Sequence, residues 1–157
     1  MLDILSISAV ELGKKIAAGE ITSVEATKAF LDRIGAVEKD INAYITVDTE
    51  GALAAAAEAD KMIKEKKAAG EALSPFAGVP VAIKDNMCIE GMLTTCASHI
   101  LDGFKPTYTS TAVEKLIEAG AVILGHTNMD EFAMGSTTET SYYGATKNPR
   151  NLERVPH

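Results

Sequence analysis

The chain has 157 residues, of which 46% are hydrophobic and 24% are charged, and its formal net charge is −7. This length suits one domain with a sizeable core. No apolar run approaches the roughly 18 residues that a membrane span needs, and no basic segment precedes an apolar one at the start, which excludes a secretory signal. We therefore expect a cytoplasmic globular protein whose two cysteines, Cys88 and Cys96, are reduced.

The charge pattern argues against direct nucleic-acid binding, which usually requires a basic face. The densest basic run, at residues 61–67, is interleaved with acidic residues that include Asp60 and Glu65. Such mixed charge is typical of a solvated helix face.

The first third of the chain predicts helices. Residues 8–11 and 22–25 have the sequence of capping boxes, and Gly19 stands where the first helix should end. A short strand is expected at about 44–47. Asp48 or Thr49 should then cap a long alanine-rich helix that runs from about 52 to 68.

The second half predicts strands joined by a helix. Residues 79–84 form a β-branched strand, 111–120 a capped helix, and 121–125 a continuous apolar strand. Strand, crossover helix and strand indicate an α/β fold in which helices cover a sheet. We expect a single domain over 1–157, helical over 1–70 and α/β over 71–157. The polar segment 135–144 should be a loop.

Lys84 is the first candidate for chemistry, because it ends a strand where α/β sheets bind ligands. A desolvated lysine can act as a base near neutral pH, although a solvated charge is the plainer interpretation. Residues 81–84 also match the strand lysine of protein kinases, but no glycine-rich loop precedes them, so we reject that interpretation.

Other polar residues are weaker candidates. Cys96 and His99 have no second pair to complete a zinc site, so we expect no metal. Asp130 and Glu131 would diverge on a helix, and Asp130 better suits a helix cap or the first turn of a helix. The loop at 134–139 is rich in small residues and hydroxyls, which let backbone approach a ligand, or it is a plain surface turn.

Several motifs occur in an order that resembles the amidase-signature family. Residues 76–86 resemble that family's lysine motif, and residues 94–98, 108–113, 125–136 and 148–156 are similar to further motifs of its A subunits of glutamyl-tRNA(Gln) amidotransferase. The wording Met-Asp-Glu-Phe at 129–132 favours this branch over stand-alone amidases. The resemblance covers nearly the whole chain and implies a mixed sheet covered by helices.

The resemblance implies a Ser-cisSer-Lys mechanism in which Lys84 is the base. A serine in a cis peptide would relay a proton from a nucleophilic serine, and glutamine would lose its amide as ammonia. The loop formed by Ala133, Met134, Gly135 and Ser136 would line the amide pocket. Ammonia would pass to a B subunit, which uses ATP and magnesium and holds the tRNA, and a C subunit would clasp the pair. This chain itself would carry no cofactor.

The sequence also departs from the family. Neither serine motif occurs, and His157 stands where a glycine is expected, so we expect an N-terminal portion that is inactive alone and that self-associates through uncovered strand edges. His126 replaces a usual lysine, and Arg150 with Asn151 replaces a usual Trp-Asp, which we expect to be surface substitutions. A stand-alone amidase and a non-catalytic interaction module remain the alternatives.

Overall fold

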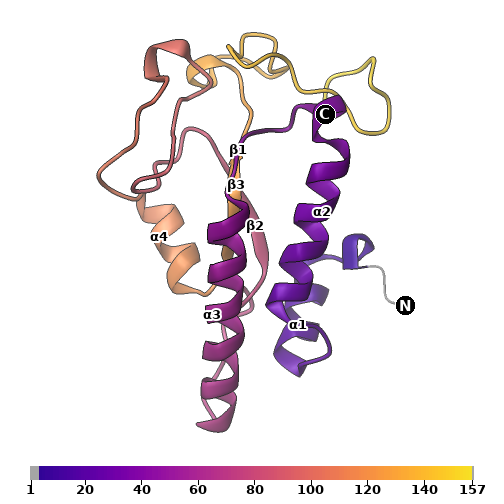
Figure 1. Ribbon diagram of the computed structural model, residues 1–157, viewed down its shortest axis with the longest axis vertical. Helices are drawn as coiled ribbons and strands as arrows, with labels where there is room; N and C mark the ends of the chain where they lie inside the picture. The colour runs from indigo at the N-terminus through magenta and orange to yellow at the C-terminus, as the bar shows by residue number, and fades with distance from the viewer. Residues whose placement is uncertain (1–3, 157) are drawn as a thin grey trace. The chain divides into compact units, whose positions relative to one another are not determined.

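The computed structural model describes residues 4–156, and His157 lies outside them. Every predicted helix and strand is present, with bounds that differ by a few residues (Figure 1). In chain order the elements are α1 (Ala9–Ala18), α2 (Ser23–Ile41), β1 (Tyr44–Val47), α3 (Thr49–Ala68), β2 (Pro80–Lys84), α4 (Thr111–Glu118) and β3 (Val122–Thr127). Short 3-10 turns lie at Ile4–Ser6, His99–Leu101 and Glu131–Ala133.

The three strands form a mixed sheet in the order β1-β3-β2. β1 is antiparallel to β3, with Tyr44 opposite Thr127. β2 is parallel to β3, because hydrogen bonds join Val122 N to Val79 O and Asp85 N to Thr127 O, so that both partners advance together. The predicted α/β class with a mixed sheet is confirmed, and α4 is the crossover between β2 and β3.

Gly125 allows β1 to approach β3 closely. Its φ is +146°, a conformation that L side chains rarely adopt, and a Cβ built there would collide with the carbonyl oxygen of Thr46. The central strand therefore requires glycine at this position.

The predicted helix caps are present. The hydroxyl of Ser8 accepts a hydrogen bond from Glu11 N at 3.2 Å. The carboxylate of Glu25 accepts one from Thr22 N at 2.8 Å, and Glu25 N donates to the Thr22 hydroxyl at 3.1 Å. α3 begins earlier than predicted, at Thr49, because the Asp48 carboxylate accepts from Gly51 N and so caps its first turn.

The chain divides into two compact units. The first comprises the described residues up to Arg33, Asp48–Val81 and Lys115–Leu124, and the second comprises Ile34–Val47, Ala82–Glu114 and the described residues from Gly125 on. The core of the first unit contains Leu12, Ile16, Ile21, Ala26, Ile63, Ala77 and Val79.

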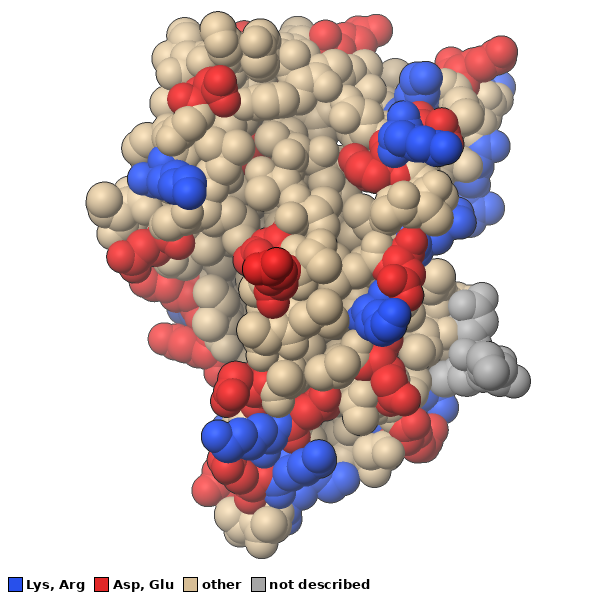
Figure 2. Space-filling model, viewed as in Figure 1, with Lys and Arg blue, Asp and Glu red and all other residues tan. Residues whose placement is uncertain are grey.

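α3 supplies polar caps to α1 and α2 inside the first unit. The Asp60 carboxylate accepts from Ser23 N at 2.7 Å and from Val24 N at 3.1 Å, which caps the start of α2. The Lys67 ammonium donates to Ala17 O at 2.8 Å at the end of α1. The predicted solvated helix face is therefore wrong for Asp60, which is partly buried, whereas Lys67 is exposed as predicted although it bonds α1. Lys side chains mix with Asp and Glu over the lower end of α3 (Figure 2).

None of the described helices combines the length and the apolar character that crossing a membrane would require.

Candidate active site around Lys84

Lys84 ends β2, and its side chain is exposed. The chain turns immediately after it, since Met87 N donates to Lys84 O at 3.0 Å. The neighbouring residues Ile83 and Asp85 are buried, at 1% and 0% exposed. The lysine therefore projects from a turn whose adjacent residues are fixed in the interior.

Asp85 organises the segment at residues 95–97. Its carboxylate accepts from Thr95 N at 3.1 Å, from the Thr95 hydroxyl at 2.5 Å and from Ala97 N at 3.2 Å. Its carbonyl accepts from Cys96 N at 3.0 Å. Hydrogen bonds to a charged acceptor are stronger than neutral ones, so this set holds the turn after Lys84 firmly.

His126 reaches the same carboxylate from β3. Its Nδ1 lies 3.3 Å from Oδ1 of Asp85, and the ring is 0% exposed. The prediction of a surface substitution at this position is therefore wrong, because β3 is the middle strand and is buried on both faces. Arg150 and Asn151, in contrast, are exposed as predicted.

Two pairs of residues near this network have left-handed backbone without being glycine. Cys96 and Ala97 have φ of 52° and 56°, and Phe132 and Ala133 have φ of 50° and 62°. A hydrogen bond of 2.9 Å from Phe132 N to Cys96 O joins the two pairs. Such conformations cost about 1–3 kcal/mol each and concentrate at functional sites.

Asp130 shapes the loop that follows. Its carboxylate accepts from Thr137 N at 2.9 Å, from Thr138 N at 2.8 Å and from the Thr140 hydroxyl at 2.9 Å. The backbone hydrogen bond from Thr138 is the main cause that lowers the pKa of Asp130. Asp130 occupies the predicted cap position before Glu131–Ala133, but its side chain makes no capping bond there.

The loop passes so close to Asp130 that a Cβ on Gly135 would overlap the Asp130 carboxylate. Glycine is therefore required by space at this position. The four residues predicted to line a pocket, Ala133, Met134, Gly135 and Ser136, are all exposed, and Met134 is 78% exposed.

The structure thus connects the predicted site residues through one hydrogen-bonded path within the second unit. The path runs from Asp85, beside Lys84, through Cys96 to Phe132, beside Ala133. Sequence reasoning identified Lys84 and the loop but missed Asp85 and Cys96, which carry the connection, and the buried His126 that contacts Asp85.

A family model described as Amidase matches residues 25–156. The chain belongs to the amidase family. It is 61% identical over 155 residues to the A subunit of the glutamyl-tRNA(Gln) amidotransferase of Lachnospira eligens, covering 99% of this chain and 31% of that protein. The chain therefore spans about a third of the length of the curated relatives that it matches, and its predicted resemblance to these A subunits is confirmed.

Solved amidases have the same fold. A structure of fatty acid amide hydrolase matches with a TM-score of 0.85 and 32% identity, covering 95% of this chain and 26% of that one. The A subunit of the Thermotoga maritima glutamyl-tRNA(Gln) amidotransferase matches with a TM-score of 0.75 and 35% identity, covering 99% of this chain and 30% of that one.

Both cysteines of this amidase-family chain are free thiols. Burial raises the pKa of Cys96, and the nearby Asp85 and Cys88 raise it further. Among residues 4–156, no group of three or more His, Cys, Asp or Glu side chains is arranged to hold a metal ion.

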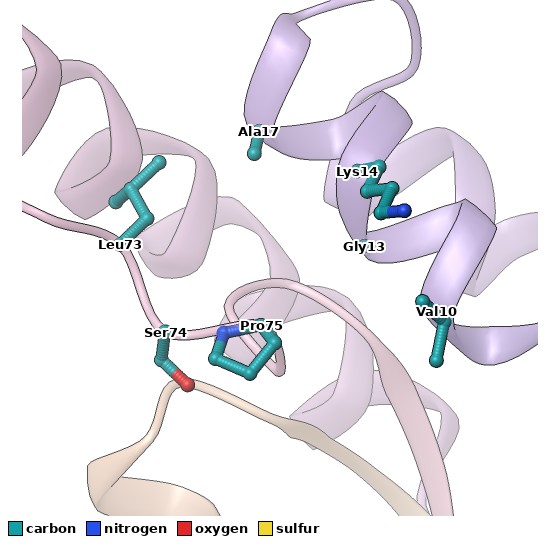
Figure 3. Close-up of a pocket in the computed structure, with 7 residues that line it drawn as sticks. All are labelled: Val10, Gly13, Lys14, Ala17, Leu73, Ser74 and Pro75. Carbon is teal, nitrogen blue, oxygen red and sulfur yellow. The ribbon is translucent and has the colours of Figure 1, made fainter.

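The first unit of the amidase-family chain has a shallow pocket of about 180 Å³ between α1 and the loop at residues 73–75 (Figure 3). It includes none of the predicted site residues. Its volume lies below the roughly 300 Å³ at which small-molecule sites begin, so it does not compete with the Lys84 region as a candidate active site.

Proposed function

We propose that this chain forms the lysine-bearing N-terminal part of the glutamine amidase subunit of a glutamyl-tRNA(Gln) amidotransferase. The observation that carries the proposal is the 61% identity to an A subunit over 99% of the chain. The match spans 31% of that relative, so the activity belongs to a larger subunit of which these residues are one part.

In this proposal Lys84 is the base of a Ser-cisSer-Lys mechanism. Its exposed side chain, on a turn fixed by buried neighbours, suits a group that must exchange protons with a second residue. Neither serine motif occurs in the 157 residues, so we propose that they do not hydrolyse glutamine alone. A base without its nucleophile has no covalent step to assist.

Ala133, Met134, Gly135 and Ser136 would contact the amide of glutamine. Their exposure, and the way that Asp130 fixes the following residues 137–140, support this role. Because the Asp130 hydrogen bonds already order this loop, binding a ligand there would cost little conformational entropy of the backbone.

The partners would be a B subunit, which receives ammonia and uses ATP and magnesium, and a C subunit. The net charge of −7 agrees with tRNA being held by the B subunit rather than by this chain. The free thiols of Cys88 and Cys96 suit a reducing compartment, in line with a cytoplasmic location.

The test is ammonia release from glutamine by the full-length protein that carries this chain, with and without B and C subunits. We expect release that rises with the partners and falls at least about 1,000-fold in Lys84→Ala, as expected for the loss of a catalytic base. Lys64→Ala, which removes an exposed lysine on α3, is the matched control and should behave like the parent. Full activity of Lys84→Ala would refute the role of the lysine.

A stand-alone amidase is the second candidate, because the fatty acid amide hydrolase structure superposes with the higher TM-score, 0.85 against 0.75 for the Thermotoga maritima protein. Hydrolysis of simple aliphatic or aryl amides without partners, and no response to B and C subunits, would favour it.

A further inference from the structure

Two buried ionisable side chains, Asp85 and His126, have no part in the proposed chemistry. Both are 0% exposed, and each is surrounded by polar partners within the second unit. A buried carboxylate is costly unless it is paired and hydrogen-bonded. Asp85 directly follows Lys84 in the chain and His126 reaches it from β3, so the pair bears on how Lys84 is held.

The surroundings of His126 indicate which form of the ring fits. Nδ1 lies 2.8 Å from Leu93 O, and Nε2 lies 3.1 Å from Met87 O. A carbonyl oxygen can only accept, whereas a neutral imidazole has one N–H donor. Both bonds form only when both ring nitrogens carry hydrogen, and the Asp85 carboxylate at 3.3 Å then balances the positive charge.

The same contacts fix the turn that carries Lys84. Met87 donates its N–H to Lys84 O and accepts from the His126 ring through its own carbonyl. At the start of the turn, the residue after Lys84 is fixed to β3, because Asp85 N donates to Thr127 O at 3.2 Å. The exposed lysine thus stands on a turn that is held at both ends by His126 and Asp85.

We propose that the Asp85–His126 ion pair is a positioning element for Lys84. This inference rests on the proposed function, in which Lys84 is the base. Without the imidazolium, a buried carboxylate loses its counter-charge and two carbonyls lose their donors, so the turn must shift. A displacement of about 1 Å of a catalytic group can lower the rate about 100-fold.

The first test concerns protonation and needs no activity. In the ¹⁵N-histidine-labelled chain at pH 7, both His126 ring nitrogens should show the shifts of N–H nitrogens, and the signals should disappear in His126→Leu. His99 is the control, because it is exposed and stacks on Tyr142 at a centroid distance of 4.4 Å. One bare ring nitrogen at His126 would overturn the ion pair.

The second test uses the full-length protein with glutamine. His126→Leu should lower kcat about 10- to 100-fold and change KM less than about twofold, because the base is displaced while the amide pocket is intact. His126→Lys should recover at least about a third of kcat, since the three donors of an ammonium match the three acceptors at Leu93, Met87 and Asp85. His99→Leu, the matched control, should stay within about twofold of the parent.

Equal losses of kcat in His126→Leu and His126→Lys would overturn the proposal, because the charge would then have no role. Unchanged kcat in both variants would overturn it as well. If His126→Leu fails to fold, the kcat of His126→Lys decides between the outcomes: a value of at least about a third of the parent kcat supports the proposal, and a lower value overturns it. A parent protein that releases no ammonia from glutamine would refute the proposed function, whereas the histidine spectrum would still report on the ion pair.

Discussion

Asp60 lies on α3, but replacing it by alanine should destabilise the chain by removing the cap of another helix, α2. The Asp60 carboxylate accepts from two backbone amides at the start of α2, Ser23 N at 2.7 Å and Val24 N at 3.1 Å. Ser23 is 0% exposed, so water cannot replace the lost acceptor at its amide. Hydrogen bonds to charged groups contribute about 1.5–3 kcal/mol each, and an N-cap about 1 kcal/mol.

Because the two bonds share one carboxylate, we expect a loss of about 2–4 kcal/mol rather than their full sum. At about 2–4 °C per kcal/mol for a chain of this size, Tm should fall by roughly 5–15 °C. Urea unfolding gives the free energy, and amide hydrogen exchange should show faster exchange at Ser23 and Val24.

The matched control is Asp32→Asn on α2. Asp32 pairs with Lys28 at 3.4 Å, and both side chains are well exposed, so its removal should cost no more than about 0.5 kcal/mol. Equal stability of Asp60→Ala and Asp32→Asn, or unchanged exchange at Ser23, would refute the view that α3 caps α2.

Three further predictions concern the second unit and α2. The lowered pKa of Asp130 adds stability that is present above the ordinary aspartate pKa of about 4 and is lost as the pH falls through the lowered pKa. Asp130→Asn should therefore melt below the parent at pH 7, and the gap in Tm should narrow as the pH is lowered below about 4; a gap independent of pH would contradict this. In Cys88→Ser, Cys96 should react with iodoacetamide at pH 8 more slowly than free cysteine does, because burial raises its pKa, and an equal or faster rate would count against that cause. Gly125→Ala should lower the free energy of unfolding, measured in urea, by about 1–3 kcal/mol or more. Gly35→Ala is the control: its new Cβ meets nothing within 4 Å, so it should stabilise α2 by about 0.5–1 kcal/mol. Similar effects of the two substitutions would contradict the close approach of β1 to β3.

Local signals made the helices and strands predictable. The capping boxes at Ser8 and Thr22 act within four residues, so their sequence alone reveals them. Asp60 is different, because it caps a helix that begins 37 residues earlier in the chain, and its sequence context indicates only a charged helix face.

The site was predictable in part for the same reason. The position of Lys84 at the end of a predicted strand indicated a candidate site residue, and the small residues around Gly135 indicated a loop that could contact a ligand. The role of Lys84 as a base was predicted only from the family resemblance. The burial of His126 depends on the place of β3 in the sheet, which no local pattern contains. The left-handed backbone of Cys96 and Phe132 has no sequence signal, since neither residue favours that conformation.

The second unit combines segments that are far apart in the chain, and this separation affects when the unit can fold during synthesis. The side chain of Asn42 donates to Tyr143 O and Gly144 O, about a hundred residues later, and within residues 4–156 β1 pairs with β3 alone. At about 5–20 residues per second on the ribosome, β1 waits roughly 4–16 seconds for that partner. Folding of the second unit is therefore late relative to the synthesis of β1, because its contacts are complete only after about a hundred further residues have been added.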